Sequence, residues 1–179
     1  MKKVLKEILE TSIYIVVVLV ITLLIVTFVG QRTHVNGSSM WPTLEDGDNL
    51  IVDKISYRFS SPKRFDIIVF PFQYAKDTYY IKRIIGLPGE AVQIDDSGII
   101  YINDEPLSEE YGTEIMIDPG VASERKILKD NEYFVLGDNR NESSDSRDPS
   151  VGLIEREIII GKAWIRIFPF DKFGSIKHQ

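Results

Sequence analysis

Two side chains in this sequence could together cleave an acyl bond. Ser39 lies in a short segment that Gly37 makes conformationally free and that Pro42 constrains, so its hydroxyl and its own backbone N–H can both face a substrate. Lys82 lies in the largely apolar run 79–85. A serine hydroxyl attacks a carbonyl carbon when a neighbouring base removes its proton, and an uncharged lysine amine can be that base.

A lysine base must be uncharged at the working pH, and the ordinary lysine pKa of about 10.4 is too high for that. On a strand, Lys82 and Arg83 point to opposite faces, and Lys82 shares a face with Tyr80 and Ile84. Apolar walls would lower the pKa by disfavouring the ammonium form, by about 3–4 kcal/mol for a useful base. The structural alternatives are commoner: an ordinary turn serine, and a strand lysine that extends to water.

A third segment, residues 136–147, is rich in charged and hydroxyl side chains. Taken alone, its sequence is typical of a polar surface loop with internal ion pairs. Beside a lysine base, the same segment could supply a hydrogen-bond partner for the amine. The flexible lysine stem positions the amine poorly unless a hydrogen-bond partner orients it.

Other chemistries find little support in the composition. The only two histidines, His34 and His178, lie close before Ser39 and at the end of the chain, which argues against a Ser-His-Asp triad. Cysteine is absent, which excludes disulfides and a thiol nucleophile, and the presence of only two histidines argues against a catalytic zinc site. The net charge of -6 argues against a general nucleic-acid binder. We therefore expect no metal and no cofactor.

The N-terminal part of the chain predicts a membrane anchor. Residues 11–31 carry no charge and would span about 30 Å as a helix. Lys2, Lys3 and Lys6 precede this stretch and only Arg32 closely follows it, which places the N-terminus in the cytoplasm. A buried helix would not need such a long charge-free stretch, and a cleavable signal peptide would have a shorter one. We expect a cytoplasmic segment 1–10, an anchor 11–31 and an extracytoplasmic domain 32–179.

The remainder of the chain predicts a mainly β domain, coiled or barrel-like, because short apolar or alternating runs recur between turn residues. Turns are expected at 96–98 and 129–132, and an irregular, mobile loop at 108–125. The expected strands are 50–52, 66–70, 79–85, 91–94, 99–102, 133–136, 158–160 and 163–168.

Three blocks, 37–44, 80–89 and 137–140, resemble type I signal peptidases, the bacterial leader peptidase family, in order and spacing. The resemblance runs from about Val35 to Ile154 and is closest to the compact Gram-positive forms with one anchor. It implies a serine endopeptidase with a Ser/Lys dyad, in which the serine directly before methionine is the nucleophile. That residue is Ser39 and not Ser38, and the base is Lys82.

The same resemblance assigns roles in the third block. Ser143 would orient the Lys82 amine, Asp145 would pair with Arg147 to hold the loop, and Asp138 would pair with Arg83. One departure concerns oxyanion stabilisation, because some members carry at position 37 a serine whose hydroxyl helps to form the oxyanion hole, and this chain has glycine there.

The resemblance also implies the substrate. Exported preproteins with small residues at positions -1 and -3 would bind extended beside 35–39 and 80–82, close to a lipid bilayer. The substrate-binding residues expected there are Val35, Gly37, Met40, Tyr80 and Ile81. The alternative function is a catalytically inactive, membrane-anchored β domain that acts as a binding module.

Overall fold

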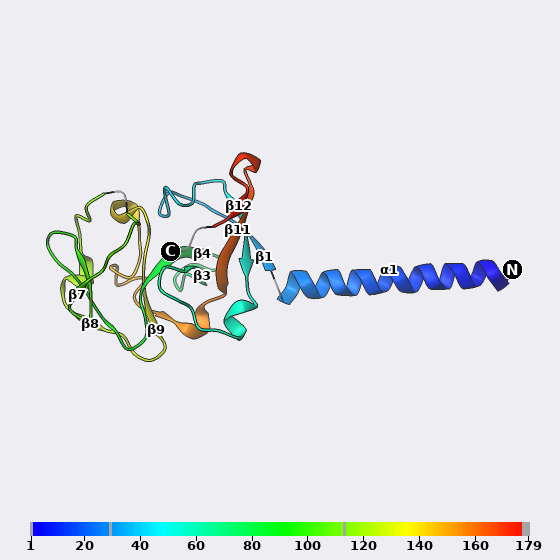
Figure 1. Ribbon diagram of the computed structural model, residues 1–179, viewed down its shortest axis with the longest axis horizontal. Coiled ribbons are helices and arrows are strands. Elements are labelled where there is room, and N and C mark those ends of the chain that lie inside the picture. Colours follow the sequence, from blue (N-terminus) through cyan, green and yellow to red (C-terminus); the bar gives the residue numbers. More distant parts are fainter. Residues whose placement is uncertain (1, 29, 113, 177–179) are drawn as a thin grey trace.

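The computed structural model describes residues 2–28, 30–112 and 114–176, and consists of a long helix that projects from a β-rich body (Figure 1). The helix α1 (Lys2–Phe28) contains most of the apolar run, but it begins earlier and ends earlier than the predicted segment 11–31. Gly30 and Gln31 belong instead to strand β1 (Gly30–His34), where they pair with Asp53 and Val52. No helix in these described ranges is long and apolar enough to cross a membrane.

The larger sheet is antiparallel and contains eight strands in the order β1-β2-β11-β3-β4-β9-β10, with β12 paired to β11. This confirms a mainly β domain, but β1 and β10 are the ends of the path, so the described strands do not close a hydrogen-bonded barrel. The strands after β1 are β2 (Asn49–Asp53), β3 (Ile67–Pro71), β4 (Tyr79–Gly86), β9 (Glu132–Leu136), β10 (Ile154–Glu155), β11 (Gly161–Phe168) and β12 (Gly174–Ser175).

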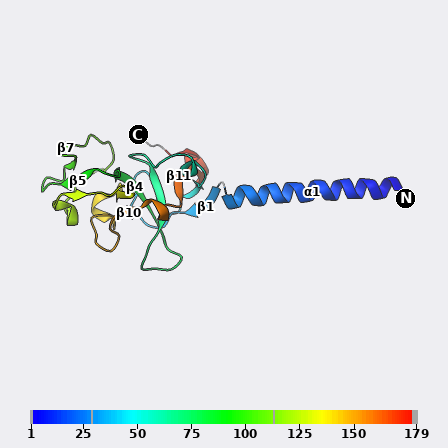
Figure 2. The same ribbon diagram turned by 90° about the horizontal axis from the view of Figure 1, so that it is seen from below.

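A second, smaller antiparallel sheet lies at the end of the body away from α1 (Figures 1 and 2). Its strands are β5 (Ala91–Ile94), β6 (Ile100–Ile102), β7 (Glu105–Pro106) and β8 (Lys126–Ile127), in the order β7-β6-β5-β8. Both predicted turns are confirmed: Gly98 N–H donates to the Asp95 carbonyl at 2.9 Å, and Glu132 N–H donates to the Lys129 carbonyl at 3.1 Å.

The predicted strand 158–160 is wrong. Ile158 ends a 3₁₀ turn and Ile159 is buried in the core, and of these three residues only Ile160 bonds a described strand, through its N–H to the Val69 carbonyl of β3 at 2.9 Å. The predicted loop 108–125 is irregular, as expected, but includes the buried side chains of Met116 and Ala122. The 3₁₀ turns are η1 (Ser56–Arg58), η2 (Gly120–Ser123), η3 (Arg140–Glu142), η4 (Arg156–Ile158) and η5 (Phe170–Lys172).

The hydrophobic core is divided into three clusters, and the first of them supports the segment that carries Ser39. Val35, Met40 and Leu44 pack there against Val69 of β3 and Ile81 of β4. A second cluster joins the small sheet to β4 and β9, and a third covers the other side of β3, β4 and β9. The central strands β4 and β9 are therefore buried, and groups placed on them are held rigidly.

Candidate active site

Ser39 lies in a turn that is fixed on both sides. Upstream, Gly37 adopts a φ of 88°, and its N–H donates to Asp46 Oδ1 at 2.7 Å. Downstream, the Met40 side chain is only 2% exposed and anchors the turn in the core. The carbonyl of Ser39 accepts a hydrogen bond from Asn139 N–H at 3.1 Å, which ties the turn to the third block.

The side chain of Lys82 meets this turn from β4. Its Nζ lies 2.7 Å from Ser39 Oγ and 3.1 Å from the Ile81 carbonyl oxygen. The Tyr80 ring lies on the same side, 5.0 Å from Nζ, as expected for alternate residues of a strand. Lys82 is 3% exposed, and burial lowers its pKa to about 8, although Asp145 and Asp138 act in the opposite direction. A serine hydroxyl and a lysine amine that can be uncharged near neutral pH are thus in contact, which is the geometry that a Ser/Lys dyad requires.

Gly137 explains how the third block approaches the pair so closely. A Cβ at this position would lie 2.2 Å from Ser143 Oγ and 2.4 Å from the Ser39 carbonyl oxygen, so only glycine fits. Ser143 is therefore a near neighbour of the Ser39 turn. Its hydroxyl oxygen is buried but has no hydrogen-bond partner within the described part of the chain, and the predicted bond to Lys82 is not formed in this structure.

Behind the site lies a buried ion pair between Arg83 and Asp138, formed by two hydrogen bonds of 2.8 and 2.6 Å. Both side chains are at most 1% exposed. The Tyr111 ring covers the guanidinium at 3.4 Å from its centroid. Because Asp138 follows Gly137 directly, the pair fixes the third block against β4.

A second buried ion pair holds the rest of the third block. Asp145 accepts hydrogen bonds from Arg147 Nε at 2.8 Å and Nη2 at 2.9 Å, and from the backbone N–H of Gly137 at 3.0 Å. Arg140 forms a further ion pair with Glu109, which comes from the long irregular loop. The segment that contains Ser143 is thus clamped at both ends by charges.

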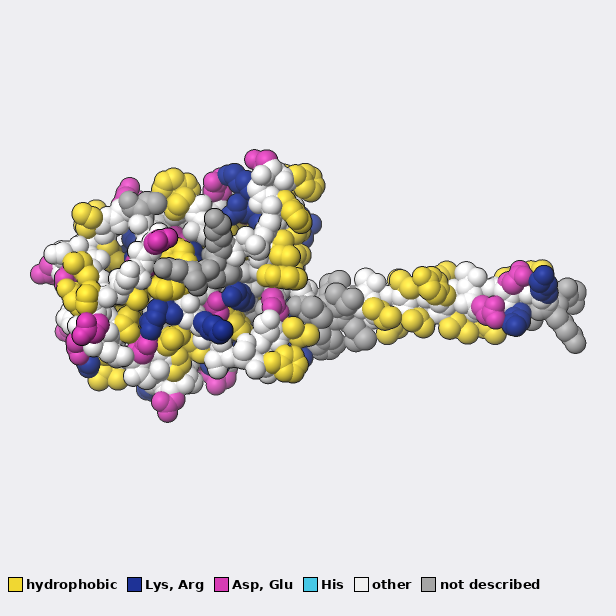
Figure 3. Space-filling view, in the orientation of Figure 1, with side chains coloured by type: hydrophobic (Ala, Val, Ile, Leu, Met, Phe, Trp, Pro, Cys, Tyr) yellow, Lys and Arg dark blue, Asp and Glu magenta, His cyan; other side chains and the backbone are white. Residues whose placement is uncertain are grey.

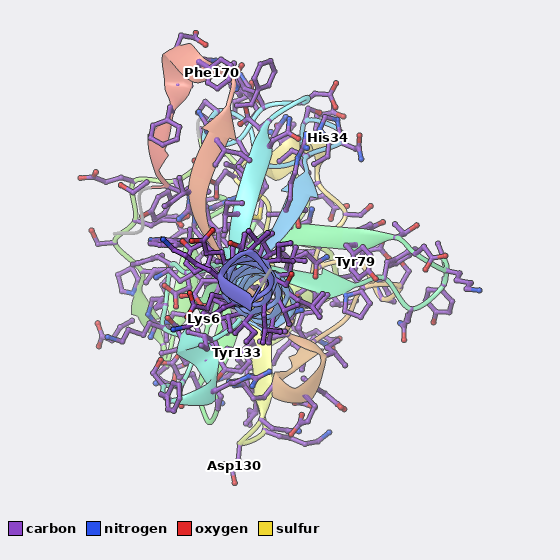
Figure 4. All side chains as sticks on the ribbon, turned by 90° about the vertical axis from the view of Figure 1, so that its right-hand side faces the viewer. Lys6, His34, Tyr79, Asp130, Tyr133 and Phe170 are labelled. Atoms are coloured by element: carbon purple, nitrogen blue, oxygen red, sulfur yellow. The ribbon has the colours of Figure 1, made fainter. Side chains whose placement is uncertain are left out.

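A cleft of about 630 Å³ runs from β1 to the Ser39–Lys82 pair, between the 31–40 and 77–82 segments. Figure 4 shows the two walls on the same side of the molecule, marked by His34 and Tyr79. All five residues predicted to bind substrate contribute to this cleft: Val35, Gly37, Met40, Tyr80 and Ile81.

The cleft also has lining residues that the sequence did not reveal, including Arg32 and Thr33 of β1, Glu142 and Ser144. β1 was missed because the apolar run was extended through Gly30 and Gln31, which hid the start of a strand. His34 is an exposed cleft residue with no predicted catalytic role, and His178 lies outside the described residues.

Comparison with known proteins gives consistent matches over most of the chain. The family model "Signal peptidase, peptidase S26" matches residues 8–168. Probable signal peptidase I-1 of Synechocystis sp. is 40% identical over 169 residues, which cover 90% of this chain and 83% of that protein. Signal peptidase I of Leptolyngbya laminosa is 42% identical over 164 residues, covering 88% and 78%. A crystal structure of a signal peptidase I from Enterococcus faecalis is 35% identical, with a TM-score of 0.47, and covers 57% of this chain and 97% of that one.

Proposed function

The chain belongs to the signal peptidase family, peptidase S26, and is a serine endopeptidase that cleaves signal peptides; we propose that Ser39 is its nucleophile and Lys82 its general base. The observation that carries this assignment is the 2.7 Å contact between Ser39 Oγ and a buried lysine amine whose pKa is lowered to about 8. A permanently charged ammonium could not accept the hydroxyl proton.

In the proposed reaction, Ser39 Oγ attacks the carbonyl carbon of the scissile peptide while its proton moves to Lys82 Nζ. The tetrahedral oxyanion accepts a hydrogen bond from the Ser39 N–H, which has no partner among the described residues. As the C–N bond breaks, Lys82 returns the proton to the leaving amine. Water then attacks the acyl-enzyme, with Lys82 again as the base, and releases the carboxylate and Ser39.

The glycine at position 37 bears on the second oxyanion donor. Its N–H is engaged by Asp46 and its side chain offers no hydroxyl, so neither group serves in this arrangement. The Ser38 side chain is exposed and lines the cleft beside Ser39, and it is the hydroxyl nearest in sequence. We assign the second donor to Ser38.

Ser143 is proposed to orient Lys82 during the reaction. Its hydroxyl is buried without a partner. A buried polar group without a hydrogen bond costs free energy, so a hydrogen bond is favourable when a partner comes within reach. Asp145–Arg147 and Arg83–Asp138 keep the segment in place.

The substrate is proposed to bind as an added strand between two sheet edges. β1 is the end strand of the large sheet, and residues 79–82 of β4 pair with β3 on one side but not with β9 on the other. The unpaired backbone groups on both edges face the cleft and can bond an extended peptide. Val35, Met40 and Ile81 supply an apolar floor that is at most 9% exposed, which favours small apolar side chains such as those at positions -1 and -3.

We further propose that the charge-free stretch 11–31, which α1 covers only in part, anchors the protein in a membrane, with the N-terminus in the cytoplasm and the β-rich body outside. Apolar side chains along α1, such as Ile15, Leu19 and Leu23, are 52–66% exposed, and they cover much of the helix surface (Figure 3). Water does not favour such a surface, whereas lipid does. The C-terminal segment that contains η5 lies at the side of the body from which α1 projects (Figure 1), and its exposed Phe170 and Phe173 side chains suit a lipid interface.

The decisive test is cleavage of a model preprotein by the full chain in detergent, with N-terminal sequencing of the product. Wild type should release the mature protein after a small residue, and Ser39→Ala and Lys82→Ala should each release none while keeping the wild-type circular dichroism spectrum. The alternative, an inactive membrane-anchored binding module, predicts no cleavage by wild type and unchanged binding in both variants.

A further inference from the structure

A second cleft adjoins the catalytic cleft and shares a wall with it. It measures about 610 Å³, and we call it the exit groove, defined by Ile117, Asp118, Val121, Ser144, Asp148 and Pro149. Ser144 lines both clefts, and Ser143 lines the exit groove beside it. A peptide that reaches Ser39 and continues past Ser144 therefore enters the exit groove.

The position of α1 sets the direction of such a peptide. The catalytic cleft begins near Gln31, immediately after α1, and ends at Ser39, Lys82 and Ser144. In the proposed function the signal peptide comes from the membrane, so its residues lie along β1 and the scissile bond lies at Ser39. The chain after the scissile bond then leaves past Ser144. An extended chain advances about 3.3 Å per residue, so several residues fit in a groove of this size.

The charges of the exit groove are unbalanced. Arg140 and Arg147 line it, but each is neutralised by a carboxylate, Glu109 and Asp145 respectively. The two lining aspartates have no ion-pair partner in the described ranges. Asp118 Oδ1 accepts the N–H of Gly120 and Asp148 Oδ1 accepts that of Ser150, both at 2.8 Å, which fixes both carboxylates in local turns.

We propose that the exit groove receives the first residues of the mature chain, and that Asp118 and Asp148 disfavour substrates with acidic residues there. This inference rests on the proposed function and extends it to the far side of the scissile bond. It makes the site selective on the mature side by electrostatic repulsion, in addition to the small-residue preference on the signal-peptide side.

The test uses one preprotein in versions that carry lysine or glutamate at the second to fourth mature positions. Wild type should cleave the lysine version with a kcat/KM about two- to fivefold higher at low salt, the range that exposed charge pairs give. Asp118→Asn/Asp148→Asn should bring the ratio close to one, because asparagine keeps the Oδ1 acceptor and removes the charge. High salt should reduce the wild-type ratio in the same way.

A matched control, Glu105→Gln/Asp130→Asn, removes the same charge from exposed positions outside the groove and should keep the wild-type ratio. A peptide that ends at the first residue after the scissile bond should be cleaved equally by wild type and the Asp118/Asp148 variant. A wild-type ratio near one, or a ratio that the Asp118/Asp148 variant leaves unchanged, overturns the inference. Failure of wild type to cleave either version counts against the proposed function instead.

Discussion

Lys82 and Arg83 are neighbours on β4, yet their side chains lie on opposite faces and have different hydrogen-bond partners. The Arg83 guanidinium is bonded to Asp138 through two nitrogens, whereas the Lys82 amine forms hydrogen bonds only with the Ser39 hydroxyl and the Ile81 carbonyl among described groups. A guanidinium remains charged in proteins and suits a structural ion pair, while a buried amine can lose its proton. The alternation of side chains along β4 therefore places the structural ion pair of Arg83 on one face and the proposed base, Lys82, on the other.

The rate of cleavage should rise with pH through about 8 and then level off, because burial lowers the pKa of Lys82 to about 8 and only the uncharged amine accepts a proton. A pH profile of single-turnover cleavage measures this. Lys82→Arg should be inactive over the whole range. A profile that is flat between pH 6 and 9, or normal turnover by Lys82→Arg, would contradict the general-base role.

The free energy of unfolding should also depend on pH, because the pKa of Lys82 differs between the native and the unfolded chain. Between pH about 8 and 10.5 the unfolded chain keeps a proton on Lys82 that the native chain has lost, so the free energy of unfolding rises with pH there. Below that window the fold bears the full cost of the buried ammonium. Lys82→Met should therefore be more stable than wild type at pH 7, by up to about 3 kcal/mol, and the difference should vanish above pH 10.5. Urea unfolding in detergent tests this, and a Lys82→Met variant less stable at pH 7 would refute it.

Ser143→Ala should lower kcat by about tenfold or more with little change in KM, because it removes the hydroxyl proposed to orient Lys82. Its free energy of unfolding should stay level or rise, since the hydroxyl is buried without a partner. Ser144→Ala is the neighbouring control and should have the smaller effect on kcat. If Ser144→Ala lowers kcat and Ser143→Ala does not, the orienting role belongs to Ser144 and not to Ser143.

Gly137→Ala should abolish cleavage and lower the free energy of unfolding by about 1–3 kcal/mol, because the new methyl group overlaps both Ser143 Oγ and the Ser39 carbonyl oxygen. Gly30→Ala is the control, because its methyl group meets nothing closer than 3.2 Å. Thermal unfolding and product formation measure the two effects. A fully active Gly137→Ala would mean that the third block need not approach the nucleophile so closely.

Asp138→Ala should lower the free energy of unfolding by about 3–5 kcal/mol, because it leaves the Arg83 cation buried without its partner. Glu124→Ala removes a partner from the exposed Glu124–Lys126 pair and should cost less than about 1 kcal/mol. Equal losses in the two variants would show that burial does not determine the value of the Arg83–Asp138 pair.

Local patterns were sufficient where residue type alone restricts structure. Apolar alternation located β4 and β9, and Asp96-Ser97-Gly98 located a hairpin turn. The candidate site needed more than local patterns, because a turn serine and a strand lysine usually have structural roles, and only the resemblance of the three blocks in order and spacing indicated Ser39 and Lys82.

Features that depend on partners distant in sequence were not predictable in this way. The two-residue strands β7, β8, β10 and β12 exist only because another strand pairs with them. Tyr111 covers Arg83 from an irregular loop whose sequence has no periodicity. The 158–160 run has strand-forming residues, but the core takes Ile159 as a packing residue instead.

The two open sheet edges beside the catalytic cleft carry backbone groups without a strand partner, and such edges are as much a hazard as an asset. Backbone hydrogen bonds hold any extended segment regardless of its sequence, including the cleaved signal peptide and the edge of another molecule. Fast turnover then requires that side-chain contacts contribute little to affinity, so that the product leaves as readily as the substrate enters. A floor that accepts only small side chains meets this requirement, because it selects the substrate by excluding larger residues and not by binding it tightly.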